Sequence, residues 1–153
     1  MADKLYVAVI GPGEATEDGR AHAEAVGRGL AHQGAIVVTG GLQGVMAAAS
    51  KGATEAGGTA VGILPGSDRD TGNVWLTIAI PTGLGELRNG LVIRAADVVI
   101  AIGGGHGTLS EIALALKAKM PVIGLNTWQI DGVEQASSPD QAVEHALLRA
   151  RTE

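Results

Sequence analysis

The segment VVIAIGGGHGTLSE occupies residues 98–111 and decides the fold of this chain. Its first part, Val98–Ile102, is a run of β-branched and small apolar residues, typical of a strand buried on both faces of a parallel sheet. Glycines at 103–105 and 107 end the run, and a helical pattern follows from Thr108. A strand, a glycine-rich turn and a helix N-terminus predict an anion site, because the free N–H groups of the first helical turn point at the ligand.

Strand-like and helix-like segments alternate along the rest of the chain. We expect strands at residues 5–10, 35–39, 59–64, 75–80, 98–102 and 121–125, and helices at 16–33, 45–56, 86–95 and 108–118. A last helix is expected with Ser138 as its N-cap and Pro139 as its first residue. The alternation predicts an α/β, Rossmann-like three-layer fold, with a parallel sheet between two helix layers, as a single domain over residues 1–153.

Composition limits the classes of function. Hydrophobic residues make up 46% of the 153 residues, and the net charge of −5 argues against a general binder of nucleic acid or of anionic membranes. Cysteine is absent and the histidines lack metal-ligand spacing, so we expect no metal site. A strand from Leu5 leaves no room for a signal peptide, and no apolar run approaches the roughly 18 residues of a membrane span, so we expect a cytoplasmic protein.

Three glycine loops follow three of the expected strands. Their candidate ligand-binding residues are Gly11 and Gly13 in the first, Gly40, Gly41 and Gly44 in the second, and Gly104, Gly105, His106, Gly107 and Thr108 in the third. Ligands of open α/β sheets bind beyond the carboxyl ends of the strands, so these loops predict a phosphate-bearing ligand. The third glycine of the dinucleotide fingerprint and the lysine of the Walker A motif are both missing. NAD and ATP are therefore disfavoured, whereas a mononucleotide is not.

Arg88 is a candidate ligand-binding cation. At about 100° per residue it falls within the apolar stripe of its expected helix, together with Leu87 and Leu91. A cation in the first turn of a helix also opposes the helix dipole. An inward Arg88 therefore requires an anion, which is either the ligand or a buried carboxylate such as Asp97 or Glu111.

Glu111 has two interpretations. The segment Thr108-Leu-Ser-Glu111 fits a capping box, in which Thr108 is the N-cap and Glu111 reaches back to the Thr108 N–H. The helix N-terminus would favour the charged carboxylate, which suits a base or the stabilisation of an oxocarbenium-like state better than an acid. Both interpretations place Glu111 beside the third glycine loop.

The helix expected at 108–118 is apolar on every side over residues 112–116, IALAL. Such a helix is buried on two sides. One side would face the sheet and the other a second subunit, so we expect a homodimer or homotetramer through this helix.

These segments also resemble a known family. GGHGTLSE at 104–111 is similar to the Gly-Gly-x-Gly-Thr-x-x-Glu signature of the "lonely guy" (LOG) family, the cytokinin riboside 5′-monophosphate phosphoribohydrolases, also labelled lysine decarboxylase-like. Arg88, GGLQGVM at 40–46 and GILP at 62–65 match further motifs of that family. Gly103 replaces its proline and Asn89 replaces its lysine. PTGLGELRN at 81–89 and IGGG at 102–105 look closer to a bacterial branch that resembles molybdenum cofactor carrier proteins.

The resemblance implies two alternative functions. As a hydrolase, the protein would cleave the N-glycosidic bond of a nucleoside 5′-monophosphate, with Arg88 and Glu111 as the catalytic pair and the glycine loops on the phosphate. As a carrier, it would hold a nucleotide or the molybdenum cofactor in the same pocket without chemistry. Neither function implies a required cofactor or a metal. The acidic balance disfavours a nucleic-acid-binding role.

Overall fold

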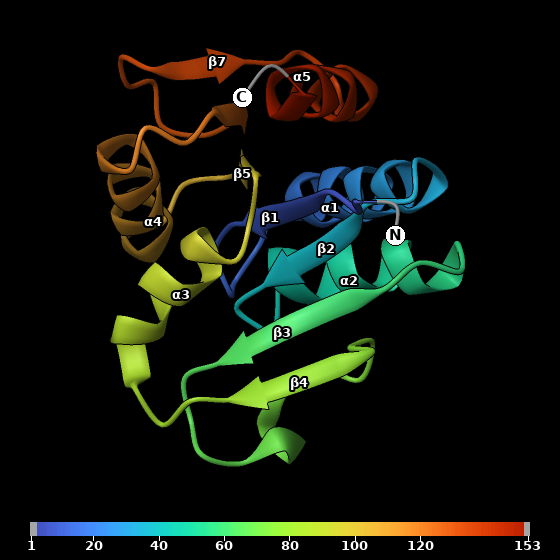
Figure 1. Cartoon of the computed structure of the whole chain (residues 1–153), viewed down its shortest axis with the longest axis vertical. Coiled ribbons are helices and arrows are strands. Elements are labelled where there is room, and N and C mark those ends of the chain that lie inside the picture. The colour runs from blue at the N-terminus through green and yellow to red at the C-terminus, as the bar shows by residue number, and fades with distance from the viewer. Residues whose placement is uncertain (1–2, 152–153) are drawn as a thin grey trace.

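The computed structural model describes residues 3–151 and contains a seven-stranded sheet (Figure 1). The strands are β1 (Tyr6–Ile10), β2 (Ile36–Thr39), β3 (Ala60–Leu64), β4 (Ile78–Pro81), β5 (Val98–Ile102), β6 (Val122–Leu125) and β7 (Val133–Gln135). They are ordered β4-β3-β2-β1-β5-β6-β7, and every neighbouring pair is parallel. Strand order reverses between β1 and β5, and ligands of open α/β sheets bind at such a switch point.

Two helix layers cover the sheet, which confirms the predicted three-layer α/β fold. One contains α1 (Glu17–His32), α2 (Val45–Glu55) and α5 (Pro139–Arg151), and the other contains α3 (Asn89–Arg94) and α4 (His106–Lys117). Figure 1 shows α3 and α4 together on the left and the other three helices on the right. Two 3-10 turns, η1 (Arg69–Thr71) and η2 (Gly85–Arg88), complete the regular structure of the described residues. No helix among them is both long and apolar enough to cross a membrane.

Strand β5 lies at the centre of the core, as its sequence predicts. All five of its residues are buried. Successive side chains of a strand point to opposite faces, so Val98, Ile100 and Ile102 pack with α1, α2 and α5, whereas Val99 and Ala101 pack with α3 and α4. Each buried branched side chain contributes about 1.5–3 kcal/mol. This burial holds the glycine loop after β5 at a defined place on the sheet edge.

Strand β4, strand β7 and the helix expected at 86–95 differ from the expected pattern. Strand β4 begins at Ile78 and not at residue 75, and β7 was not expected because three residues carry too short an alternation to recognise. The helix expected at 86–95 is a 3-10 turn followed by the short α3. Gly83 and Gly85 turn the chain just before it, with φ angles of 68° and 60°.

The predicted apolar stripe on this segment is wrong. Leu87 and Leu91 are 79% and 42% exposed, whereas Val92 and Ile93 are buried. A 3-10 turn advances about 120° per residue, so it shifts the inward face relative to the pattern of an α-helix. Arg88 nevertheless points inward, as the sequence predicts.

Candidate functional site

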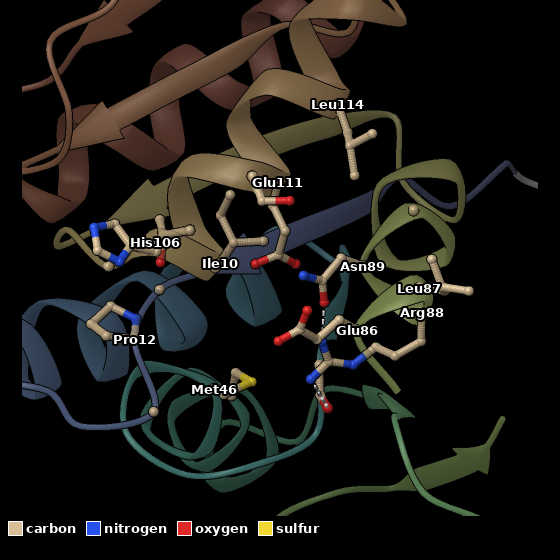
Figure 2. Close-up of a pocket in the computed structure, with 18 residues that line it drawn as sticks. Ile10, Pro12, Met46, Glu86, Leu87, Arg88, Asn89, His106, Glu111 and Leu114 are labelled. Atoms are coloured by element: carbon tan, nitrogen blue, oxygen red, sulfur yellow. Dashed lines mark hydrogen bonds between the residues drawn. The ribbon is translucent and has the colours of Figure 1, made fainter. Parts of the chain in front are cut away.

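A cavity of about 810 Å³ lies at the carboxyl ends of the central strands (Figure 2). It is lined by the loop after β1, the segment around the start of α2, the η2–α3 segment and the first half of α4. These are residues 10–13, Gly40, Met46, residues 86–90, residues 105–108, Ser110, Glu111 and Leu114.

Most of the residues singled out in the sequence meet in this cavity. Gly11, Gly13, Gly40, Arg88, Gly105, His106, Gly107, Thr108 and Glu111 line it. Three other glycines face the protein instead. Gly41 packs against Leu64 and Gly44 against Pro12, and a Cβ on Gly104 would lie 3.6 Å from the indole nitrogen of Trp128. Packing explains the lack of a side chain at Gly41 and Gly44, whereas the distance at Gly104 is an ordinary van der Waals contact.

The N-terminus of α4 borders the cavity, and no side chain of the described residues closes it. The helix begins at His106, and its N-cap Gly105 supplies no side-chain acceptor. Thr108, the third residue of the helix, is 2% exposed, and its Oγ1 has no hydrogen-bond partner in the described chain. The first N–H groups of a helix have no partner within it. This end of α4 therefore presents N–H donors, with a buried hydroxyl beside them, to an anion.

The capping box predicted for Thr108 and Glu111 is wrong. The Gly105 carbonyl already accepts from the Leu109 N–H at 2.9 Å, so the helix starts two residues earlier than expected. Glu111 is thereby the sixth residue of α4, beyond the first turn. Its carboxylate cannot act as the cap of this helix.

Arg88 is buried, and neutral oxygens hold its guanidinium. Its Nε donates to the Ile63 carbonyl at 2.9 Å, its Nη2 to the Gly40 carbonyl at 3.3 Å, and its Nη1 to the side-chain oxygen of Asn89. A Cβ on Gly40 would lie 2.6 Å from Nη2, so a side chain there would displace the guanidinium.

The predicted alternative of a buried ion pair for Arg88 is not found. No salt bridge links Arg88 to a carboxylate within residues 3–151. Asp97 instead accepts the Tyr6 N–H at 2.9 Å. Burial lowers the pKa of Arg88, while the charge of Glu111 opposes that shift. The cation at the cavity wall therefore has no bonded anion from these residues.

Glu111 is 8% exposed, and burial raises its pKa to about 7, although the positive charge of Arg88 opposes the shift. The expectation that the helix N-terminus favours its charged form is wrong. The dipole acts mainly within the first turn, whereas Glu111 lies further along α4 in a poorly hydrated position. Near neutral pH the side chain exchanges a proton and can donate or accept a hydrogen bond.

Three polar residues that line the cavity were not predicted, namely Glu86, Asn89 and Ser110. Asn89 is buried and accepts from Arg88. Figure 2 shows it between Glu111 and Arg88, with the exposed Glu86 directed into the same space. The only signal for Asn89 was that it replaces the lysine of the LOG motif. Glu86 carried no signal in the sequence.

Comparison with known proteins identifies the family. The model of the SLOG cluster4 family matches residues 4–151. The chain belongs to the SLOG cluster4 family. The predicted relationship to the LOG superfamily is thereby confirmed.

Similar proteins cover almost the whole length of this SLOG cluster4 chain. An uncharacterized protein of Archaeoglobus fulgidus is 39% identical over 94% of this chain and 95% of its own. The molybdenum cofactor binding protein of Rippkaea orientalis is 39% identical over 100% of both chains, with a TM-score of 0.92. The Moco carrier protein of Chlamydomonas reinhardtii is 36% identical over 99% of this chain and 100% of its own, with a TM-score of 0.90. The predicted carrier-like branch is confirmed by these relatives.

Proposed function

We propose that this protein binds the molybdenum cofactor, a phosphorylated pterin, and holds it without chemical change. The phosphate would lie at the open N-terminus of α4. The single observation that carries the phosphate site is the buried Thr108 hydroxyl, which has no partner in the described chain and lies beside the free N–H groups of that helix. The molybdenum cofactor is favoured because relatives matched over the full length are described as binding or carrying it.

Helix α4 and Arg88 would act together on the phosphate. Helix N-termini bind anions through their N–H groups and their dipole. Arg88 adds a cation whose three recorded partners are neutral oxygens, which leaves its charge available to the ligand. A cavity of about 810 Å³ falls in the range of ligand pockets, so it has room for a ring system beyond the phosphate.

The test is retention of the cofactor by the purified protein. Molybdenum cofactor released anaerobically from a molybdoenzyme is incubated with the protein and separated by gel filtration. Molybdenum is counted by mass spectrometry and the pterin by fluorescence after oxidation. We expect molybdenum and pterin to elute together in the protein fraction. When the pterin has first been dephosphorylated, we expect that neither elutes with the protein. Elution of the intact cofactor entirely as free small molecule would rule out the proposal.

A hydrolase is the second candidate, and the placement of Glu111 favours it. Glu111 lines the same cavity as Arg88, and its pKa of about 7 suits proton transfer near neutral pH. The protein would then release the base from a nucleoside 5′-monophosphate. Chromatography of reactions with a panel of purine and pyrimidine monophosphates tests this. Base release by wild type, lost in Glu111→Gln, would favour the hydrolase. No release, with retention of the molybdenum cofactor, would favour the carrier.

We also propose a homodimer or homotetramer that forms through the α3–α4 face. Leu87 and Leu114 are exposed at the cavity rim, although both are apolar. On the same side of the sheet, Ile78 and Ile80 are 48% and 45% exposed. Ile80 pairs in register with Ile63, which packs in the α3–α4 cluster, so the two share a face. Exposed leucines beside a bare strand surface suit an interface between copies of one chain.

Light scattering coupled to gel filtration tests the oligomer. We expect a mass of two or four chains for wild type and of one chain for Leu87→Glu. Leu148→Glu is the matched control, because Leu148 is an exposed leucine on α5, in the opposite helix layer. A monomeric wild type would contradict the proposal. The cytoplasmic location and the lack of nucleic-acid binding stay predictions, open to cell fractionation and gel-shift assays.

A further inference from the structure

The segment after β6 contacts the third glycine loop from outside the cavity. Thr127 donates its hydroxyl hydrogen to the Gly103 carbonyl at 2.5 Å. Trp128 donates its indole Nε1–H to the Gly105 carbonyl at 3.2 Å. Neither residue is among those that line the cavity in the described chain. Both therefore touch the loop without touching the space reserved for the ligand.

Pro12 supports the same loop. A Cβ on Gly103 would lie 3.2 Å from the Pro12 ring, and a Cβ on Gly105 would lie 3.5 Å from it. A Cβ on Gly104 would instead approach the indole of Trp128, at 3.6 Å. The three glycines are thus packed between a proline ring and an indole ring. A side chain at Gly103 would require a small movement of the Pro12 ring, whereas the distances at Gly104 and Gly105 are ordinary contacts.

The carbonyl contacts also determine where the loop N–H groups point. In a planar trans peptide the N–H is antiparallel to the C=O. The Gly105 carbonyl accepts from Trp128 and from the Leu109 N–H, the latter at 2.9 Å, so this carbonyl points along α4. The His106 N–H belongs to the same peptide and therefore points the opposite way, out of the helix N-terminus. The Gly103 carbonyl bond to Thr127 likewise fixes the peptide that carries the Gly104 N–H.

We propose that Thr127 and Trp128 are positioning residues that hold the third glycine loop in its anion-binding conformation. Glycine has the largest conformational freedom of any residue, and three in succession would otherwise lose that freedom when the ligand binds. Bonds that order the loop beforehand remove this cost from binding. The expected effect of these residues on ligand affinity rests on the proposed phosphate site. Their expected effect on the order of the loop does not.

The experiment measures loop order and affinity separately. Thr127→Val removes the donor but keeps the methyl group that packs near Gly124, and Thr127→Ser restores the donor. Trp128→Phe removes the indole N–H and keeps an aromatic ring. Trp75→Phe is the matched control at the other tryptophan, whose ring centroid lies 5.6 Å from the Lys51 ammonium nitrogen. Nuclear magnetic relaxation reports the backbone order of Gly104, Gly105 and Gly107 in the ligand-free protein.

We expect Thr127→Val and Trp128→Phe to lower the order parameters of the loop glycines, and Thr127→Ser and Trp75→Phe to leave them unchanged. Binding of inorganic phosphate, and of the molybdenum cofactor, should weaken by roughly three- to tenfold in the first pair only. Unchanged loop order in that pair would overturn the proposal, as would lower order with unchanged affinity. If wild type binds neither probe, the proposed function fails, and loop order alone decides whether these residues hold the loop.

Discussion

The N-termini of α4 and α5 carry the same sequence pattern but are capped differently. Thr108-Leu-Ser-Glu111 and Ser138-Pro-Asp-Gln141 both fit a capping box. At α5 the Ser138 hydroxyl accepts from the Gln141 N–H at 3.1 Å, and Gln141 in turn accepts from the Ser137 N–H at 2.7 Å. At α4 no side chain closes the end, and the hydroxyl of Thr108 is left buried without a partner in the described residues.

The difference shows what each helix end does. Side chains accept from backbone N–H groups at the start of α5, so this helix end contributes to stability and has few free donors for a ligand. The start of α4 keeps its donors free, which costs stability while the protein is empty. A sequence pattern for capping is therefore not sufficient to distinguish a closed helix end from a binding site. The difference lies in the N-cap, because α4 begins before Thr108 and its N-cap, Gly105, has no side-chain oxygen to accept from the first N–H groups.

The largest expected effect comes from placing a carboxylate at the open end. A Cβ on Gly107 meets no atom within 4 Å, so Gly107→Asp can fold, and the helix dipole favours its charge. Two unit charges about 4 Å apart at an effective dielectric constant of about 20 repel by about 4 kcal/mol. We expect phosphate or cofactor binding to weaken by about a thousandfold, measured by calorimetry. Gly107→Ala is the control, and equal binding by both variants would place the phosphate elsewhere.

The second effect concerns Glu111 and pH. Its folded pKa of about 7 lies above the ordinary value of 4.5, so between these values the folded state holds more protons than the unfolded state. Stability therefore falls as pH rises from about 4.5 to 7, by on the order of 3 kcal/mol from this group. Glu111→Gln should lose this part of the pH dependence and become the more stable protein above pH 7. Urea unfolding of both proteins across that range tests it, and parallel pH profiles would contradict the burial of a titrating Glu111.

The third effect has opposite signs on stability and binding. Thr108→Val removes a buried hydroxyl that lacks a partner within residues 3–151, so we expect the empty protein to gain about 1 kcal/mol. A hydrogen bond to a charged group contributes about 1.5–3 kcal/mol, so phosphate binding should weaken by at least about tenfold. Thr108→Ser should bind as wild type does. Loss of both stability and affinity in Thr108→Val would mean that the hydroxyl supports the fold.

The smallest effect is at α5. Ser138→Ala removes the hydroxyl that accepts from Gln141 and should lower stability by about 1 kcal/mol, measured by denaturant unfolding. Affinity for phosphate should not change, since this helix end does not line the cavity among the described residues. A change in affinity comparable to that of Thr108→Val would remove the contrast between the two helix ends.

The sequence predicts the layers of the fold well, and it predicts the site in part. The buried run of β5 and the alternation of elements are local patterns, so they identify the sheet, and the glycine loops identify its ligand edge. The roles of Asn89 and Glu86 depend on the 3-10 turn at Gly85–Arg88, which shifts the inward face by an amount that an α-helical pattern does not show. The open end of α4 depends on the helix starting at His106 after the N-cap Gly105, a start that the capping-box pattern of Thr108 and Glu111 does not show.

The cavity wall combines four segments that are far apart in the chain, from the loop after β1 to Leu114 in α4. A ligand held by all four binds the folded chain and not the unfolded one, so at a hundred times its dissociation constant it would add about 2.7 kcal/mol of stability. In a cell, the empty protein would unfold more often and be degraded sooner than the loaded one. The abundance of this protein would then follow the supply of its ligand, without any dedicated regulator.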